Sequence, residues 1–267
     1  FAEQFVVAPH QVATTTSPED LAEGQRLLKA RGCADCHGSD FAGKHFVDDP
    51  GLGKLASSNI TGGKGSAVGS YSDLDLERII RHAVRPTGLP LFFMPAHEYW
   101  FLSDVELGRI IQALRQVPKV DRDPPPHQPT LLLKMLTVFG VFDGLPARLV
   151  DHNKDHEPGP AVGVTAEFGQ YLAVTCKGCH GKGFAGGPIP GAPPSIPVPT
   201  NLTPAKDGLL QYKEAEFLTV MRTGKRPDGT DINPFMPWKV YSHMTDTELK
   251  ALYTYLMSLP AREFGGR

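Results

Sequence analysis

Two stretches of the chain, residues 103–118 and 245–260, place apolar residues at helical spacing. Within each stretch these residues fall at positions i, i+3, i+4 and i+7, which lie on one face of an α-helix. Ser103 and Thr245 each precede a glutamate by three positions, a capping-box pattern that marks a helix start. The pattern therefore predicts two amphipathic helices, each with one buried face. The predicted buried positions are Leu107, Ile110, Ile111 and Leu114 in the first helix and Leu249, Leu252, Tyr253 and Leu256 in the second.

More helices are predicted upstream of each of these two. Ser17 before Pro18 is a typical helix start, because the hydroxyl can cap free N–H groups and proline suits the first turn. This helix leads into Cys33, and its counterpart over residues 167–175 leads into Cys176. A second helix in each half is predicted to begin after Ser72 and near Lys213.

The segments between these helices are rich in glycine, proline, asparagine and serine, as in residues 186–204. Such segments form turns and cannot build a packed core by themselves. A large, flat, apolar cofactor would supply the missing core to a domain of this size. We therefore expect a mainly α protein whose irregular segments wrap around cofactors.

The two halves of the chain are copies of one module. A shift of 142 or 143 positions aligns them well beyond the terminal helices, with a one-residue slip at one turn. The matching segments are Asn59-Ile60-Thr61 with Asn201-Leu202-Thr203, Phe93-Met94-Pro95 with Phe235-Met236-Pro237, and the Arg-Pro-x-Gly turns that begin at Arg85 and Arg226.

The repeat predicts two tandem domains, residues 1–120 and 161–267, joined by a connector over residues 121–160. The proline-rich part of the connector, residues 121–129, should be stiff and extended. The apolar part, residues 131–142, is too short to span a bilayer. We expect this apolar part to pack inside the protein, because exposed apolar patches of its size are uncommon. The alternative is a docking surface for a partner or a membrane face.

Charge and composition narrow the range of partners. The chain has 27 basic and 29 acidic side chains, which gives a formal net charge of -2. This balance offers no basic surface for nucleic acid. Phe1 is not a translation start, so we expect a signal peptide or a membrane anchor upstream, and membrane association through that anchor.

The four cysteines all belong to two copies of one pattern, CADCH at 33–37 and CKGCH at 176–180. A Cys-x-x-Cys pair suits a disulfide, a redox-active dithiol, half of a zinc site, or two thioether bonds to haem. The histidine after each second cysteine is typical of c-type haem attachment, in which it ligates the iron. The pattern therefore predicts two covalent haem c groups. The predicted attachment residues are Cys33, Cys36, Cys176 and Cys179, and the predicted iron ligands are His37 and His180.

Of the six methionines, Met94 and Met236 occupy equivalent positions in the two copies, and each precedes a proline. Met94 follows His37 by 57 residues, and Met236 follows His180 by 56. We therefore predict the axial pairs His37/Met94 and His180/Met236. The alternative is that these methionines fill cores, as most methionines do. The rival histidine ligands are His45, His82 and His97 in the first copy and His243 in the second.

The repeated turns also supply candidates for binding the haem propionates. Arg85 and Arg226 are placed to form charge-assisted hydrogen bonds with propionates. Asn59 and Asn201 are candidates for the same role through their side-chain and backbone donors. The alternative for the arginines is an ordinary solvated turn.

Together these motifs give the chain a family resemblance. Both halves resemble class I c-type cytochrome domains. The run from NLTP at 201–204 through FMPWKVYSHMTDTELKALYTYLMSLP at 235–260 is similar to the cytochrome c subunits of bacterial membrane-associated alcohol, gluconate and aldehyde dehydrogenases. The resemblance implies cysteine-bound haem, His and Met axial ligands, and electron transfer from a dehydrogenase towards quinone or an oxidase. Those subunits typically carry three haem domains and two are present here, so a permanent dehydrogenase partner does not follow.

With both faces of each iron occupied, no substrate can reach the metal, and this favours an electron carrier over an enzyme. We expect a dihaem cytochrome that exchanges single electrons with redox partner proteins, such as a dehydrogenase and a terminal oxidase or another cytochrome. Covalent haem attachment of this form predicts the bacterial periplasm or the outer face of the inner membrane. The alternative is a dihaem enzyme, a peroxidase or sulfur-compound oxidase, in which one iron has an open position.

Overall fold

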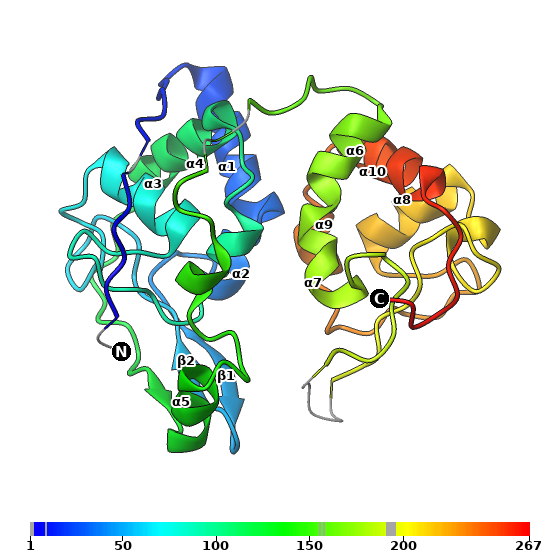
Figure 1. Cartoon of the computed structure of the whole chain (residues 1–267). Coiled ribbons are helices and arrows are strands. Elements are labelled where there is room, and N and C mark those ends of the chain that lie inside the picture. The colour runs from blue at the N-terminus through cyan, green and yellow to red at the C-terminus, as the bar shows by residue number, and fades with distance from the viewer. Residues whose placement is uncertain (1–2, 9, 155, 157, 191–195) are drawn as a thin grey trace. The chain divides into compact units, whose positions relative to one another are not determined.

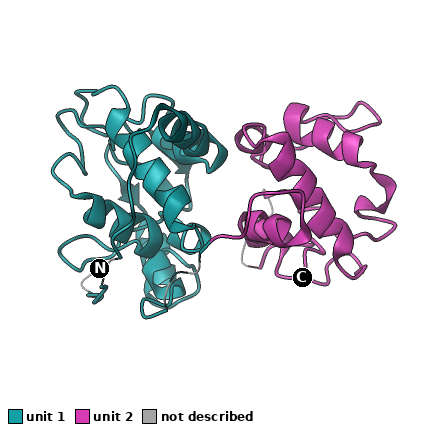
Figure 2. Ribbon diagram, turned by 90° about the horizontal axis from the view of Figure 1, so that it is seen from above, with its two compact units in different colours: residues 1–158 teal, residues 159–267 magenta. Residues whose placement is uncertain are grey.

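The computed structural model describes residues 3–8, 10–154, 156, 158–190 and 196–267. It contains two compact units, Phe1–Pro158 (unit 1) and Gly159–Arg267 (unit 2), coloured separately in Figure 2. The boundary between them falls near the end of the predicted connector. Within the proline-rich segment 186–204, residues 191–195 lie outside the described residues.

Unit 1 is mostly helical, as the sequence predicts, and it also carries a small sheet (Figure 1). Its α-helices are α1 (Pro18–Ala30), α2 (Cys33–His37), α3 (Asp73–His82), α4 (Asp104–Gln116) and α5 (Leu131–Val138). Its 3-10 turns are η1 (Ala96–Glu98) and η2 (Pro146–Leu149). Its strands are β1 (His45–Asp49), β2 (Gly53–Ala56) and β3 (Gln128–Pro129).

Unit 2 repeats the helical plan of unit 1. Its α-helices are α6 (Ala166–Leu172), α7 (Lys177–His180), α8 (Glu214–Thr223), α9 (Trp238–Tyr241) and α10 (Asp246–Ser258). Its 3-10 turns are η3 (Ala173–Cys176) and η4 (Leu209–Gln211). In the part of the chain that the structure describes, no helix combines the length and the apolar character needed to cross a bilayer.

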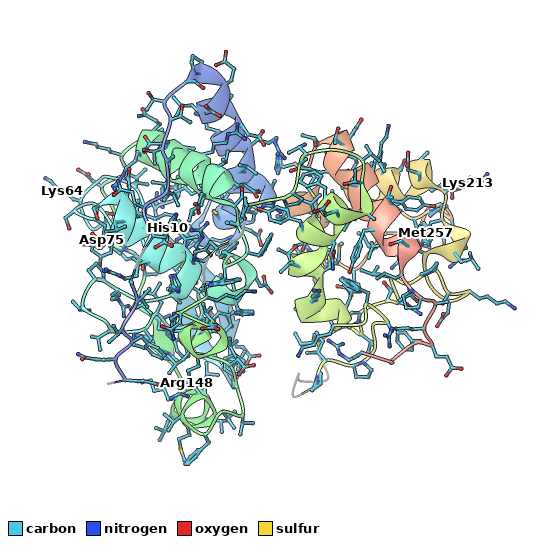
Figure 3. All side chains as sticks on the ribbon, turned by 45° about the horizontal axis from the view of Figure 1, so that its top comes forward. His10, Lys64, Asp75, Arg148, Lys213 and Met257 are labelled. Carbon is cyan, nitrogen blue, oxygen red and sulfur yellow. The ribbon has the colours of Figure 1, made fainter. Side chains whose placement is uncertain are left out.

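Side-chain caps fix the helix starts that the sequence predicts. Ser17 and Ser103 each accept a hydrogen bond from the backbone N–H three residues on, at 3.1 and 3.2 Å. Ser72 and Thr245 head complete capping boxes, and Asp75, the third residue of α3, is labelled in Figure 3. These bonds satisfy N–H groups that the first turn of a helix leaves without partners. These four predicted starts are therefore confirmed.

The first and last long helices of each unit cross at a glycine. A Cβ added to Gly24 on α1 would lie 2.2 Å from the carbonyl oxygen of Arg109 on α4. One added to Gly169 on α6 would lie 2.0 Å from the carbonyl oxygen of Ala251 on α10. A larger residue at either glycine would therefore force the two backbones apart. The core around the crossing in unit 1 includes Leu27, Leu28, Leu76, Leu107, Ile110 and Ile111.

The antiparallel sheet of unit 1 does not follow from the sequence pattern. Between β1 and β2, the Asp49 side chain accepts hydrogen bonds from the N–H groups of Gly51 at 2.8 Å and Leu52 at 2.9 Å. The third strand, β3, pairs with β2 and comes from the predicted connector. A two-residue strand from a distant segment leaves no local alternation in the sequence, so periodicity does not reveal it.

Much of the predicted connector folds onto unit 1. The hydroxyl of Thr130, before α5, donates to the carbonyl of Gly51 at 2.6 Å, which places α5 beside the β1–β2 hairpin (Figure 1). Leu133 and Thr137 on α5 are fully buried. The expectation that the apolar segment packs inside is nevertheless wrong for most of its side chains. Those that are exposed are Leu131, Leu132, Met135, Val138, Phe139 and Val141.

Candidate haem sites

Each Cys-x-x-Cys-His motif lies on a short helical turn that ends at a glycine. In unit 1, α2 begins after Gly32 (φ 75°) and ends at Gly38 (φ 85°). In unit 2, α7 ends at Gly181 (φ 80°). Because glycine adopts positive φ without strain, the chain can turn sharply after each histidine. The i, i+3 spacing of the two cysteines puts both sulfurs of a motif on one helical face.

The loop after each motif has the same backbone conformation in the two units. Phe41 (φ 56°) and Phe184 (φ 60°) occupy equivalent positions, and both adopt the left-handed conformation. Two residues later, a glycine N–H donates to the carbonyl of His37 at 2.9 Å in unit 1 and of His180 at 3.0 Å in unit 2. A non-glycine residue in this conformation costs about 1–3 kcal/mol. Its repetition indicates that one constraint shapes both loops.

A backbone carbonyl holds one ring nitrogen of each motif histidine. His37 Nδ1 lies 2.8 Å from the carbonyl oxygen of Ser58, and His180 Nδ1 lies 2.7 Å from that of Thr200. With Nδ1–H as the donor, Nε2 keeps its lone pair for a metal. Burial lowers the pKa of both imidazoles from the ordinary value, so both rings are neutral at pH 7.

An Asn-x-Thr clamp follows each of these carbonyls. Oδ1 of Asn59 accepts from the N–H and the hydroxyl of the threonine two residues later, at 2.9 and 2.8 Å. Asn201 makes the same two bonds at the same distances. Their Nδ2 atoms donate to carbonyls beyond the last helix, those of Val120 at 2.9 Å and Arg262 at 2.8 Å. Both asparagines therefore position the loop, and their contact with haem stays a prediction.

Met94 and Met236 lie in matching turns. The carbonyl of each accepts a hydrogen bond from the N–H two residues on, that of Ala96 or Trp238, at 2.8 Å in both units. Both methionine side chains are half-buried. In unit 1, Met94 and Cys33 pack against the same hydrophobic core. The motif and its predicted second ligand therefore border one core, and the axial pairing itself stays a prediction.

The two methionine turns differ in what supports them. In unit 1, Phe93 has φ 74°, and its N–H donates to the carbonyl of Gly144 at 3.0 Å. The Phe93 ring also stacks on Phe142, with ring centroids 5.8 Å apart. In unit 2, the N–H of Phe235 donates to Oδ1 of Asn233 within its own turn at 2.9 Å. The connector therefore supports the Met94 turn, whereas the Met236 turn is closed locally.

The two Arg-Pro-x-Gly turns are closed by the same bond. Nη1 of Arg85 donates to the carbonyl of Pro90 at 2.8 Å, and Nη1 of Arg226 donates to that of Asp231 at 2.6 Å. A guanidinium has five N–H donors in a planar fork, so each arginine retains donors for an anionic group. The propionate role of both arginines stays a prediction.

The rival histidines of unit 1 lie in different surroundings. His82 is buried, and its Nδ1 lies 2.9 Å from Nδ1 of His152. His45 is exposed, and its Nε2 lies 3.3 Å from the carbonyl oxygen of Pro126. His97 is exposed after the Met94 turn. The buried histidine cluster around His82 was not predicted, because its members lie far apart in the sequence.

The donor set of each site fits a covalently attached haem. Each site brings two thiols one helical turn apart, and beside them a neutral imidazole whose Nε2 is available, while a methionine turn recurs at the equivalent position. Thiols, imidazole and thioether are the groups that attach and ligate a c-type haem. Sequence reasoning missed the carbonyls of Ser58 and Thr200, although each directly precedes a repeated asparagine.

Comparison with known protein families matches residues 166–260 to the cytochrome c family. The chain contains a cytochrome c domain. The match covers the helices of unit 2 from α6 to α10 and includes the motif that ends at His180. A cytochrome c domain implies a covalently attached haem c.

Several relatives match the chain over different lengths. The cytochrome c subunit of alcohol dehydrogenase (quinone) from Komagataeibacter europaeus is 38% identical over 269 residues, which cover 90% of this chain and 56% of that protein. A dihaem cytochrome c-type protein from Cereibacter sphaeroides is 24% identical over 274 residues, 91% of this chain and 87% of that protein. The fructose dehydrogenase cytochrome subunit from Gluconobacter japonicus is 36% identical over 112 residues, 38% of this chain and 23% of that protein. The chain thus matches less than two thirds of either dehydrogenase subunit.

Proposed function

We propose that the protein is a dihaem c-type cytochrome that passes single electrons between a dehydrogenase and a respiratory acceptor. The observation that carries this proposal is that unit 1 repeats the histidine geometry of the cytochrome c domain in unit 2. His37 and His180 are each held by one backbone carbonyl, at 2.8 and 2.7 Å, and an Asn-x-Thr clamp follows each carbonyl. The names of two relatives, cytochrome subunits of alcohol and fructose dehydrogenases, support a dehydrogenase as the donor.

Each haem, when bound, supplies an iron that takes up and releases one electron. Cys33 and Cys36 would hold the first haem through thioether bonds, with His37 and Met94 as the ligands of its iron. The corresponding residues of unit 2 are Cys176, Cys179, His180 and Met236. The carbonyl bond orients each imidazole and leaves its Nε2 available to an iron. Ligation of the iron by both His and Met would leave no open position for a substrate, which would favour electron transfer over chemistry on a substrate.

We place the protein in the bacterial periplasm or at the outer face of the inner membrane. Covalent haem attachment through Cys-x-x-Cys-His supports this placement, as does the similarity to quinone-linked dehydrogenase subunits. The acceptor would be a terminal oxidase or another cytochrome. In the alternative function, a dihaem enzyme, one iron would have to bind an external ligand.

A redox titration followed by absorption tests the proposed function. Mass spectrometry of the purified chain should first show two covalent haems. Both ferric haems should then show the weak far-red band of methionine ligation, and neither should respond to carbon monoxide or peroxide. A haem that lacks the band and binds carbon monoxide would overturn the carrier proposal in favour of a dihaem enzyme. A chain with one covalent haem would overturn the dihaem assignment.

A further inference from the structure

A buried group of ionisable side chains in unit 1 takes no part in the haem sites. Glu77 and His82 come from α3, and His152 and His156 come from the segment after η2. The side chain of Glu77 is 0% exposed, that of His82 3% and that of His156 8%. A buried carboxylate surrounded by imidazoles costs free energy unless other groups satisfy it. Some interaction must therefore offset the free-energy cost of burying this cluster.

The ligand atoms of three of these residues converge. Nε2 of His82 lies 3.8 Å from Oε1 of Glu77, and Nε2 of His156 lies 3.9 Å from the same oxygen. The three atoms all lie within 4.8 Å of one another. These separations are too long for hydrogen bonds. Zinc binds such atoms at about 2.0–2.2 Å, so small side-chain movements would bring all three onto one ion.

Some buried polar atoms of the cluster have no hydrogen-bond partner in the part of the chain that the structure describes, and a bound cation would give the Glu77 carboxylate an interaction partner. Oε2 of Glu77 and Nε2 of His152 are buried without a hydrogen-bond partner among the described residues. Nη1 of Arg81 lies 3.4 Å from Oε1 of Glu77, whereas its Nη2 donates to Asp104 at 2.8 Å and to the carbonyl of Leu102 at 2.6 Å. His10, labelled in Figure 3, also bonds Asp104 at 2.9 Å. The carboxylates of Glu77 and Asp104 thus both face the guanidinium of Arg81, which is permanently charged.

The second copy of the module shows that the fold does not need this cluster. Arg81 has a counterpart in Arg222, which bonds Asp246 at 2.8 Å as Arg81 bonds Asp104. At the positions of Glu77 and His82, however, the second copy has Leu218 and Thr223. The arginine bond therefore belongs to the shared fold, and the carboxylate and imidazole are specific to unit 1.

The surroundings of the two histidines suit metal ligation. Nδ1 of His82 is engaged by Nδ1 of His152, 2.9 Å away. Metal-bound imidazoles usually have their second nitrogen held in this way. Burial lowers the pKa of His82 to about 3 and that of His156 to about 4, so both rings are neutral at pH 7. Neutral imidazole is the form that binds metals.

We propose that Glu77, His82 and His156 bind one divalent transition-metal ion of the zinc type. Two imidazoles and one carboxylate suit zinc, whereas calcium and magnesium take oxygen ligands. His156 lies three residues before Gly159, where unit 2 begins. The ion would therefore tie the end of unit 1 to α3, directly before the chain passes into the second unit.

Zinc titration of the haem-loaded protein tests this proposal. After chelator treatment, isothermal calorimetry with Zn²⁺ should give one site per chain. X-ray absorption at the zinc edge should show nitrogen and oxygen neighbours at about 2.0–2.1 Å, and haem does not contribute at that edge. His156→Ala and Glu77→Gln should each weaken zinc binding by at least about 100-fold.

His45→Gln serves as the matched control, because His45 is an exposed histidine of the same unit outside the cluster. It should bind zinc as the natural sequence does. Haem content and the visible spectrum of each variant establish that it folds, so they test the cytochrome assignment separately. Absence of zinc binding to the natural sequence would overturn the proposal. Equal zinc affinity in all the variants would overturn it as well.

Discussion

One backbone carbonyl determines which nitrogen of each motif histidine is available to iron. Ser58 and Thr200 supply these carbonyls, and neither residue attracts notice in the sequence, because a carbonyl is common to every residue. The asparagine that follows each of them is visible as part of the repeat. At the scale of the residue, the sequence therefore predicts the ligand, and only the structure shows what orients it.

The clamp at Asn201 should stabilise unit 2 measurably. Asn201→Ala would leave the N–H and hydroxyl of Thr203 and the carbonyl of Arg262 without this partner. The hydroxyl of Thr203 still reaches the carbonyl of Arg262 at 3.5 Å, so the buried N–H of Thr203 is the main group left unsatisfied. One such group costs about 1–3 kcal/mol, and we expect the free energy of unfolding to fall by about this amount. Denaturant unfolding of the holoprotein, followed through the haem absorption, measures this loss.

Asn233→Ala is the control for this measurement. Asn233 is exposed, and its side chain accepts one hydrogen bond, from the N–H of Phe235 at 2.9 Å. Its removal should cost less than about 1 kcal/mol. Equal losses in the two variants would show that the clamp is not a special source of stability.

At the scale of the element, the glycine on the first helix of each pair sets how closely the helices approach. Gly169→Ala would place a methyl group 2.0 Å from the carbonyl oxygen of Ala251, and backbone must move to relieve the clash. Overpacking of this kind costs about 1–3 kcal/mol. We expect a lower unfolding midpoint, measured by circular dichroism against denaturant concentration.

Gly163→Ala in the same unit provides the comparison. A Cβ there meets nothing closer than 3.8 Å, so the free energy of unfolding of the variant should stay within about 0.5 kcal/mol of that of the natural sequence. If Gly169→Ala were as stable as Gly163→Ala, the crossing would have room to adjust, and close packing at Gly169 would not be required.

Elements with local signals could be predicted, and elements that depend on distant partners could not. Ser17 and Thr245 mark the starts of their helices through residues within three positions, and both form N-caps in the structure. The strand β3, by contrast, is defined by its antiparallel pairing with β2. Similarly, the sequence around Glu77 on α3 is that of an ordinary helix. Only the folded structure places His156 near this glutamate. Long-range pairing leaves no mark in a window of a few residues.

At the scale of the whole molecule, two copies of one module have acquired different surroundings. The Met94 turn rests on the connector through Gly144, whereas the Met236 turn is closed by its own Asn233. Ligand environment and burial are among the factors that set the potential of a haem. We therefore expect a redox titration to resolve two one-electron steps rather than a single step of double height.

Replacing one methionine should then identify one of these steps. Met236→His should lower one midpoint potential and leave the other unchanged, because a thioether favours ferrous iron more than a second imidazole does. Met94→His should lower the other. Met257→His, on α10 (Figure 3), is the control and should change neither. If Met236→His leaves both midpoints and the far-red band unchanged, Met236 is not an axial ligand. If it lowers both midpoints equally, the two haems do not act as separate one-electron centres.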